Sequence, residues 1–123
     1  MCSPGWKFFD DHCYYFEVTD SWTWEEAKNA CETNGAYLVK VDNGPEYDWI
    51  STNIQREVWI GANDINLEGN FTWVSDNSTV IFSMWESGEP NDYNGDEDCG
   101  AMLISGFWND FSCQWSKSYV CEK

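Results

Sequence analysis

Three short groups of oxygen-bearing residues lie close together in the second half of the chain. They are Glu89-Pro90-Asn91, Glu97-Asp98 and Trp108-Asn109-Asp110, and the cysteines Cys99 and Cys113 lie among them. Ca²⁺ binds carboxylate, amide and backbone oxygens, about six to eight of them, at 2.3–2.6 Å. Softer metals are disfavoured, because the chain has one histidine, His12, and its cysteines can pair with one another. The pattern predicts a Ca²⁺ site.

The segment from Ser83 to Asp98 carries six carboxylates and no basic residue. Such like charges repel one another unless a cation lies among them. The segment shows neither helical nor strand periodicity, and a run of this length without regular structure is usually functional or disordered. Because it ends directly in Cys99, a disulfide would hold it. We therefore interpret it as a long, anchored, acidic loop.

The Glu89–Pro90 bond could bring two of these donors to one point. An X–Pro bond can adopt the cis form, which would turn the side chains of Glu89 and Asn91 to the same side. Glu97, Asn109 and Asp110 would complete the set. Two adjacent hydroxyls of a sugar suit the remaining coordination positions, because each can give one lone pair to Ca²⁺, its proton to a carboxylate and its other lone pair to an amide. This chemistry is binding and needs no covalent step.

Length and charge bound the class of protein. The 123 residues suit a single domain, residues 1–123, and nine Trp, seven Phe and six Tyr can fill its core. The net charge of −16 disfavours binding to nucleic acids and to anionic membrane surfaces. No stretch approaches the roughly 20 apolar residues needed to span a bilayer, so membrane insertion is not expected.

The six cysteines indicate three disulfides and an oxidising compartment. The chain contains no Cys-x-x-Cys pair, the spacing that would indicate a zinc site. Two acceptor sequons, at Asn70 and Asn77, fit an extracellular surface. The first residues show no secretory leader, so we expect a mature, secreted chain.

Two helices are predicted in the first half. Thr23-Trp24-Glu25-Glu26 is a capping box, the following helix would bury Ala27, Ala30 and Cys31, and Gly35 would end it. Asn43-Gly44-Pro45-Glu46 would begin the second helix, with Tyr47, Ile50 and Ile54 on its apolar face.

The strands are expected to be short. Patterning places them at His12–Val18, Tyr37–Val41, Val58–Ala62, Phe71–Val74, Cys99–Ile104, Phe107–Trp108 and Ser118–Glu122, with a turn at Ser105-Gly106. Cys2 and Cys13 flank a loop that could close a hairpin. Two helices with several short strands predict a mixed α+β domain.

These features together resemble the C-type lectin-like domain over essentially the whole chain. The motifs that carry the resemblance are Cys2 and Cys13 of the long form, the Trp24–Cys31 helix, Trp59-Ile60-Gly61, Glu89-Pro90-Asn91, Cys99, Trp108-Asn109-Asp110, Cys113 and Cys121. The resemblance implies a fold with two helices, short antiparallel sheets, a long Ca²⁺-binding loop and three disulfides. It also implies the pairing Cys2–Cys13, Cys31–Cys121 and Cys99–Cys113, where six cysteines alone leave 15 arrangements.

The resemblance further implies two Ca²⁺ sites. The sugar-binding ion would be held by Glu89, Asn91, Glu97, Asn109 and Asp110, which would also contact the sugar. An auxiliary ion would be held by Asp64, Glu68, Asp92, Asp98 and the carbonyl of Glu97. The acidic loop alone does not point to Asp64 or Glu68.

In members similar to this chain, Glu-Pro-Asn accompanies sugars of the mannose type (mannose, GlcNAc, glucose or fucose), and Gln-Pro-Asp accompanies galactose. We therefore expect a calcium-dependent lectin with mannose-type preference. Galactose-type specificity remains an alternative, because Tyr93 follows the triplet closely and could stack on the apolar face of a sugar.

Other readings of the same residues remain open at this stage. A lectin-like domain that binds protein would not need sugar coordination. A glycosidase could use paired carboxylates such as Glu89 and Glu97, but an acidic loop around a cation keeps all its acids ionised, so an enzyme is not expected. Trp59 and Trp108 are interpreted as core, Trp85 as either surface or structural, and His12 as a bystander. A single weak site would favour a homodimer or higher oligomer.

Overall fold

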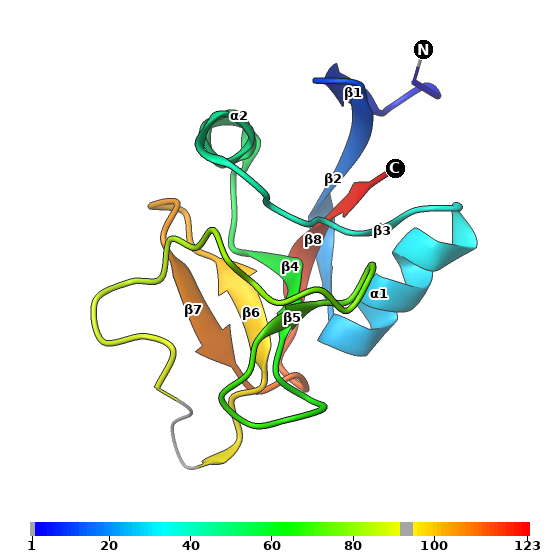
Figure 1. Cartoon of the computed structure of the whole chain (residues 1–123). Coiled ribbons are helices and arrows are strands. Elements are labelled where there is room, and N and C mark those ends of the chain that lie inside the picture. Colours follow the sequence, from blue (N-terminus) through cyan, green and yellow to red (C-terminus); the bar gives the residue numbers. More distant parts are fainter. Residues whose placement is uncertain (1, 92–94) are drawn as a thin grey trace.

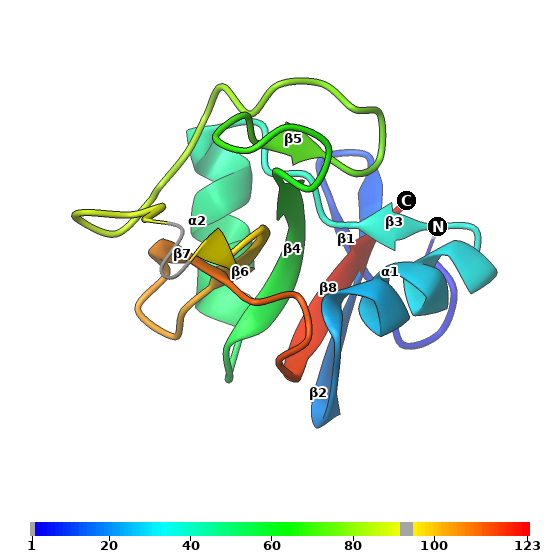
Figure 2. The same ribbon diagram turned by 90° about the horizontal axis from the view of Figure 1, so that it is seen from below.

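A computed structural model describes residues 2–91 and 95–123 of the chain. Its regular elements, in chain order, are β1 Lys7–Phe9, β2 His12–Trp22, α1 Trp24–Thr33, β3 Tyr37–Leu38, α2 Gly44–Asn53, β4 Val58–Asn63, β5 Thr72–Trp73, β6 Cys99–Met102, β7 Trp108–Phe111 and β8 Lys117–Glu122 (Figure 1). Within the described residues these strands form one sheet in the order β1-β2-β8-β4-β6-β7, with β3 beside β8 and β5 beside β4. The central strands β4 and β8 lie between the two helices (Figure 2).

The α+β class with two helices and three disulfides is confirmed, and the expected short antiparallel pairings are joined into one sheet by a parallel pairing. Strand β8 pairs with β2 and β3 in antiparallel fashion and with β4 in parallel. The C-terminal strand thereby joins the N-terminal strands to the strands of the second half. The result is one mixed sheet that is continuous across the described residues.

Both predicted helix starts are confirmed. Thr23 Oγ1 accepts from the Glu26 backbone N–H at 3.2 Å, and the Glu26 carboxylate accepts from the Thr23 N–H at 2.9 Å. Gly35, with φ at +71°, lies just past the end of α1, where a left-handed residue is favourable. Asn43 caps α2 by accepting from the Glu46 N–H at 2.9 Å, and Pro45 lies in the first turn.

Some observed strand boundaries differ from the predicted ones, because contacts with distant segments determine where these strands begin and end. Strand β2 continues to Trp22, and β1, which was not predicted as a strand, pairs with its start. Strand β3 ends at Leu38 rather than at Val41. Beyond it, the Val39 N–H donates to Val120 of β8 while the Val39 carbonyl accepts from Gly61 of β4. The backbone there bridges two strands and pairs with neither over a longer stretch.

The core is rich in aromatic rings, and the indole groups of two of its tryptophans donate to backbone carbonyls. Trp59, Trp73 and Trp108 are fully buried. The indole N–H of Trp24 donates to the Ile60 carbonyl at 2.9 Å, and that of Trp59 to the Trp22 carbonyl at 2.7 Å. The interpretation of Trp59 and Trp108 as core residues is therefore confirmed.

All three expected disulfides form. Cys2–Cys13, Cys31–Cys121 and Cys99–Cys113 have Cα–Cα distances of 5.6, 5.4 and 5.2 Å, within the usual range. The second links α1 to β8, and the third links the end of the long loop to the segment after β7. The disulfides therefore fix both the scaffold and the loop that carries the acidic residues.

Gly61 in β4 occupies a position where the structure leaves no room for a side chain. A Cβ there would lie 2.9 Å from the Leu38 carbonyl oxygen and 3.1 Å from that of Val39. We expect Gly61→Ala to lower the free energy of unfolding by about 1–3 kcal/mol, because the backbone must shift. Urea denaturation measures this. Gly44→Ala is the matched control, since its Cβ would have no atom within 4 Å. An equal loss in both variants would contradict the packing argument.

Candidate functional site: the carboxylate groups of the long loop

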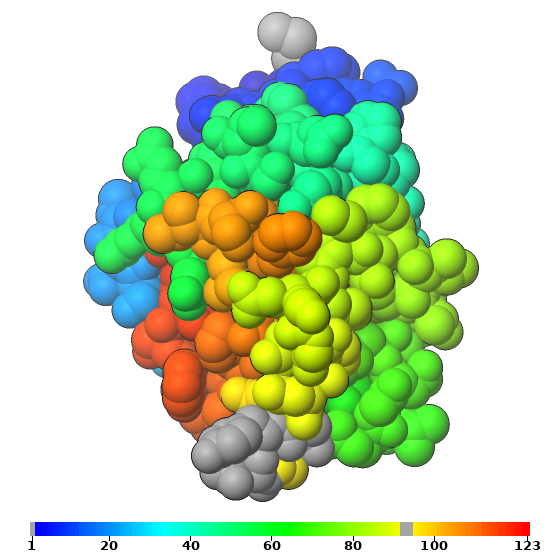
Figure 3. Space-filling view, turned by 90° about the vertical axis from the view of Figure 1, so that its left-hand side faces the viewer, coloured from blue at the N-terminus to red at the C-terminus, as the bar shows by residue number. Residues whose placement is uncertain are grey.

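Both ends of the long loop are tied to the sheet. At its start, the Trp108 N–H of β7 donates to the Met84 carbonyl and the Glu86 N–H donates to the Trp108 carbonyl, each at 2.8 Å. At its end, the Asp64 N–H donates to the Asp98 carbonyl at 3.0 Å, and Cys99 enters β6. In the space-filling view the loop residues (yellow) lie between the β6–β7 hairpin (orange) and the segment around β5 (green) (Figure 3).

An aromatic cluster supports the start of the loop. Trp85 is half-buried, and its ring meets Phe71 at a centroid distance of 4.9 Å and Trp108 at 5.7 Å, both edge to face. Trp108 also meets Trp73 at 5.8 Å. Such pairs add to the stabilisation that burial alone provides. Of the two interpretations left open for Trp85, the structural one is therefore favoured.

Three carboxylates converge beside this cluster, and we call them the primary group: Glu89, Glu97 and Asp110. Each offers an oxygen, and these oxygens all lie within 4.8 Å of one another. Glu89 and Glu97 are half-buried and Asp110 is fully buried. The Glu89–Pro90 bond is cis, as the sequence suggested. Asn91 lies with them, because its N–H donates to Asp110 Oδ1 at 3.1 Å and its Nδ2 lies 3.3 Å from Glu89 Oε2.

The electrostatics of the primary group favour a cation. Burial raises the pKa of Glu89 to about 7, and the nearby carboxylates of Asp110 and Glu97 act in the same direction. Glu89 Oε1 is buried and has no hydrogen-bond partner among residues 2–91 and 95–123. A buried polar atom without a partner is costly. A hard divalent cation would satisfy it, and an all-oxygen donor set fits Ca²⁺.

A second cluster, which we call the auxiliary group, lies at the end of β4. Asp64, Glu68 and Asp98 offer oxygens within 4.8 Å of one another. Asp64 is 2 % exposed and its Oδ2 accepts from the Gly69 N–H at 2.8 Å. Its Oδ1 is buried and has no hydrogen-bond partner in the described part of the chain. The end of the long loop contributes one residue to each group: Glu97 to the primary group and Asp98 to the auxiliary group.

The remaining predicted site residues have the following places. Asn109 is half-buried on β7, next to Asp110. Asp92 and Tyr93 lie outside the described residues. The resemblance pointed to Asp64 and Glu68, which the acidic loop alone did not. The local signal for Asp64 is its place directly after the fully buried strand β4.

Comparison with known proteins identifies the family. Residues 20–123 match the Lectin C-type domain family. The chain belongs to the C-type lectin family. A perlucin-like protein of Mytilus galloprovincialis is 36 % identical over 129 residues, which cover 98 % of this chain and 81 % of that protein.

Solved structures give the same assignment. The carbohydrate-recognition domain of the mouse scavenger receptor C-type lectin has a TM-score of 0.93 at 35 % identity, and the alignment covers 100 % of this chain and 98 % of that one. The cow CD23 carbohydrate-recognition domain, solved in the presence of a GlcNAc2Man3 oligosaccharide, has a TM-score of 0.93 at 37 % identity, with 100 % and 95 % covered.

The family assignment confirms the resemblance stated from the sequence motifs. C-type lectin domains are carbohydrate-recognition modules and not enzymes, so the glycosidase alternative is excluded. Domains of the family are generally Ca²⁺-dependent, and two groups of three carboxylates converge among the described residues. Neither helix in the described residues is long and apolar enough to cross a membrane.

Proposed function

We propose that this C-type lectin domain binds mannose-type sugars through Ca²⁺ held in the long loop. One observation carries the proposal. Three carboxylates of the primary group lie within 4.8 Å of one another, and a buried oxygen of one of them, Glu89 Oε1, has no hydrogen-bond partner among the described residues. A cation would both offset the repulsion and bind that oxygen.

The residues that would hold the ions follow from the two groups. Glu89, Asn91, Glu97, Asn109 and Asp110 would hold the sugar-binding Ca²⁺. Asp64, Glu68 and Asp98, with Asp92 from outside the described residues, would hold the auxiliary Ca²⁺. When bound, the first ion supplies a positive charge with open coordination positions for two adjacent sugar hydroxyls.

The selectivity would come from the order of acid and amide in the triplet. A sugar hydroxyl can donate its proton to the Glu89 carboxylate, and a sugar hydroxyl oxygen can accept a hydrogen bond from the Asn91 amide group. This arrangement favours the hydroxyl geometry of mannose-type sugars. The related cow CD23 domain was solved with an oligosaccharide that contains mannose. Galactose-type binding aided by Tyr93 is the alternative specificity.

A site of this size predicts weak binding to a single sugar. We expect a monosaccharide dissociation constant on the order of millimolar, which corresponds to about −4 kcal/mol. Clustered domains, as in a homodimer or larger oligomer, would convert this into useful avidity for glycan termini. The three disulfides favour an extracellular or secreted setting for the protein.

A glycan array run in Ca²⁺ and again in EDTA tests this function. We expect retention of mannose-, GlcNAc- or fucose-terminated glycans in Ca²⁺, and loss of about 100-fold or more of the signal in EDTA. Far-UV circular dichroism in EDTA would show that the domain remains folded. Sugar binding that survives complete chelation would refute the mechanism. An array without any signal in Ca²⁺ would favour a protein-binding domain instead.

A further inference from the structure

A turn directly after β5 carries the second acceptor sequon, Asn77-Ser78-Thr79. Asn77 is exposed, and its φ of +61° lies in the left-handed region, which Asn tolerates better than most residues. The Asn77 N–H donates to the Trp73 carbonyl at 2.7 Å, and the Trp73 N–H donates to the Ser78 carbonyl at 2.9 Å. Asn77 therefore lies exposed at the tip of a closed turn.

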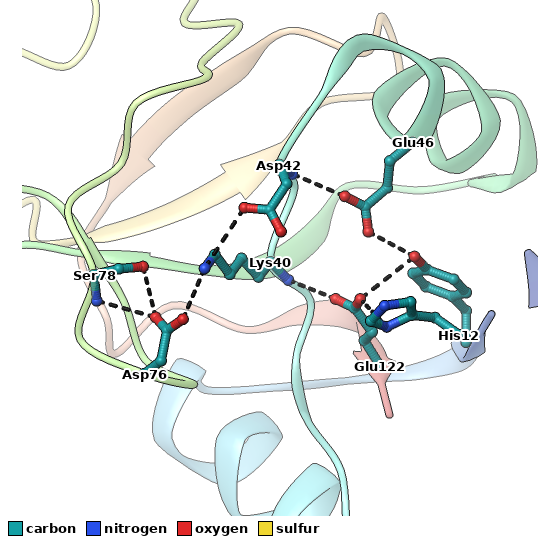
Figure 4. A network of polar contacts seen from close by, with 8 residues as sticks. His12, Lys40, Asp42, Glu46, Asp76, Ser78 and Glu122 are labelled. Atoms are coloured by element: carbon teal, nitrogen blue, oxygen red, sulfur yellow. Dashed lines mark hydrogen bonds and ion pairs between the residues drawn. The ribbon is translucent and has the colours of Figure 1, made fainter. Parts of the chain in front are cut away.

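The side chain of Asp76 holds this turn. Its Oδ1 accepts from the Ser78 N–H at 3.0 Å and from the Ser78 hydroxyl at 2.6 Å, and its Oδ2 accepts from Lys40 Nζ at 2.7 Å (Figure 4). Among the described residues, neither the Asn77 side-chain amide nor the Thr79 hydroxyl takes part in a hydrogen bond. The two groups on which an acceptor sequon depends are therefore not used by the fold.

Lys40 connects the turn to the strands at the two chain ends (Figure 4). Its backbone N–H donates to Glu122 Oε1 of β8 at 3.0 Å, while its ammonium group reaches Asp76. His12 Nδ1 of β2 lies 2.8 Å from Glu122 Oε2, so the interpretation of His12 as a bystander is wrong. The turn is thus anchored to the scaffold strands, and its geometry does not depend on the long loop.

A hollow of about 470 Å³ lies directly beside the turn. Its walls include the apolar side chains of Ile81 and Phe82 and the polar side chains of Thr79 and Lys40. Ile81 is 91 % exposed, although it is a large apolar residue. Small-molecule pockets have volumes of about 300–1,000 Å³ and combine apolar walls with a few polar groups. A sugar ring has an apolar face of ring carbons and a rim of hydroxyls, so it suits this hollow.

The first acceptor sequon, at Asn70, has different surroundings. Asn70 directly follows Gly69, whose N–H donates to Asp64 Oδ2 of the auxiliary group at 2.8 Å. A glycan there would stand beside the auxiliary group. The segment after β5 first turns toward β3, away from the acidic loop (Figure 1). A glycan on Asn77 would therefore leave both carboxylate groups open.

We propose that Asn77 carries an N-linked glycan and that the first sugars of this glycan lie in the hollow over Ile81. In the transfer, the side-chain amide nitrogen of Asn77 forms a bond to C1 of the first N-acetylglucosamine of an oligosaccharide carried on a polyprenyl diphosphate. The C1–O bond to the diphosphate breaks, the amide loses one proton, and the polyprenyl diphosphate leaves with the electron pair of that bond.

The setting of the chain fits this modification. Three disulfides indicate an oxidising, extracellular route, on which Asn-x-Ser/Thr sequons receive glycans. The relatives named above come from animals. Glycosylation of Asn77 is independent of sugar binding by the long loop, so the failure of one leaves the other intact.

Peptide mapping of the protein secreted from animal cells tests the modification. Enzymatic removal of N-glycans in H₂¹⁸O converts a glycosylated Asn to ¹⁸O-labelled Asp, and chymotryptic cleavage after Trp73 separates Asn77 from Asn70. We expect label on Asn77 in the unaltered protein and in Thr79→Ser, which keeps the sequon. Thr79→Val should show none, because valine has the shape of threonine but lacks the hydroxyl. An unlabelled Asn77 in the unaltered protein would overturn the proposal.

Thermal unfolding of the same two variants tests where the glycan lies. Thr79→Ser and Thr79→Val refolded from bacteria, where neither is glycosylated, give the effect of the substitution alone, and the pair from animal cells adds the glycan. We expect the glycan to raise the Tm by about 3 °C or more, because it covers apolar surface. With Ile81→Thr in both variants, this gain should fall by at least half. No gain, or an equal gain with Ile81→Thr, would overturn the placement over Ile81.

Discussion

Replacing Asp110 by asparagine is expected to lower Ca²⁺ affinity at the primary group by about 100-fold or more. Asp110 is fully buried, and its carboxylate lies within 4.8 Å of the oxygens offered by Glu89 and Glu97. The substitution removes one negative charge without changing the shape of the side chain. Its remaining oxygen can still accept from the Asn91 N–H, which now lies 3.1 Å from Asp110 Oδ1. Calorimetric titration with Ca²⁺ measures the loss.

The same substitution should act in the opposite direction on the metal-free protein. Removal of a charge from three neighbouring carboxylates relieves repulsion, so the Tm of Asp110→Asn in EDTA should equal or exceed that of the unaltered protein. A variant that loses Ca²⁺ binding because it is misfolded would instead show a lower Tm. The two measurements together distinguish loss of a ligand from loss of the fold.

Asp96→Asn is the matched control for this experiment. Asp96 is exposed and belongs to the same loop, but it is in neither the primary nor the auxiliary group. Its replacement removes the same charge, so the Ca²⁺ affinity should change by no more than about twofold at moderate ionic strength. An equal loss in both variants would show that the overall charge of the loop attracts the ion and that no specific site exists.

The double change Glu89→Gln with Asn91→Asp is expected to shift sugar preference toward galactose. It exchanges the acid and the amide and leaves the charge of the loop unchanged. Each hydrogen bond to a charged group contributes about 1.5–3 kcal/mol, so the ratio of mannose to galactose affinity should change by about tenfold or more. Competition by the free monosaccharides on an immobilised glycan measures that ratio.

Calcium titration of the double variant is the necessary control, because both residues are proposed ligands. A variant that retains Ca²⁺ uptake and gains galactose binding would support the acid–amide order as the basis of selection. A variant that retains both Ca²⁺ uptake and mannose preference would show that other residues of the loop, such as Tyr93, decide the specificity.

Several parts of the fold could be predicted because their causes are local. The capping box at Thr23 and Glu26 and the Asn43 cap each depend on residues three positions apart, and both helices begin there. The strand ends were less accurate. Strand β3 stops at Leu38 because the backbone beyond it bonds to both β8 and β4, and no property of Val39 to Val41 alone indicates those partners.

The candidate site divides in the same way. The sequence by itself determined the chemistry of the loop, an oxygen-only donor set around Glu89-Pro90-Asn91, since residue types and charge are present before folding. Only the tertiary structure decided that Glu97 and Asp110 reach Glu89, and that His12 reaches Glu122 from the other end of the chain. The physical reason is that these contacts depend on strand pairing and disulfides between distant segments. A neighbouring carboxylate or imidazole changes the energy of a buried charge only when the fold brings the two groups within a few ångströms of each other.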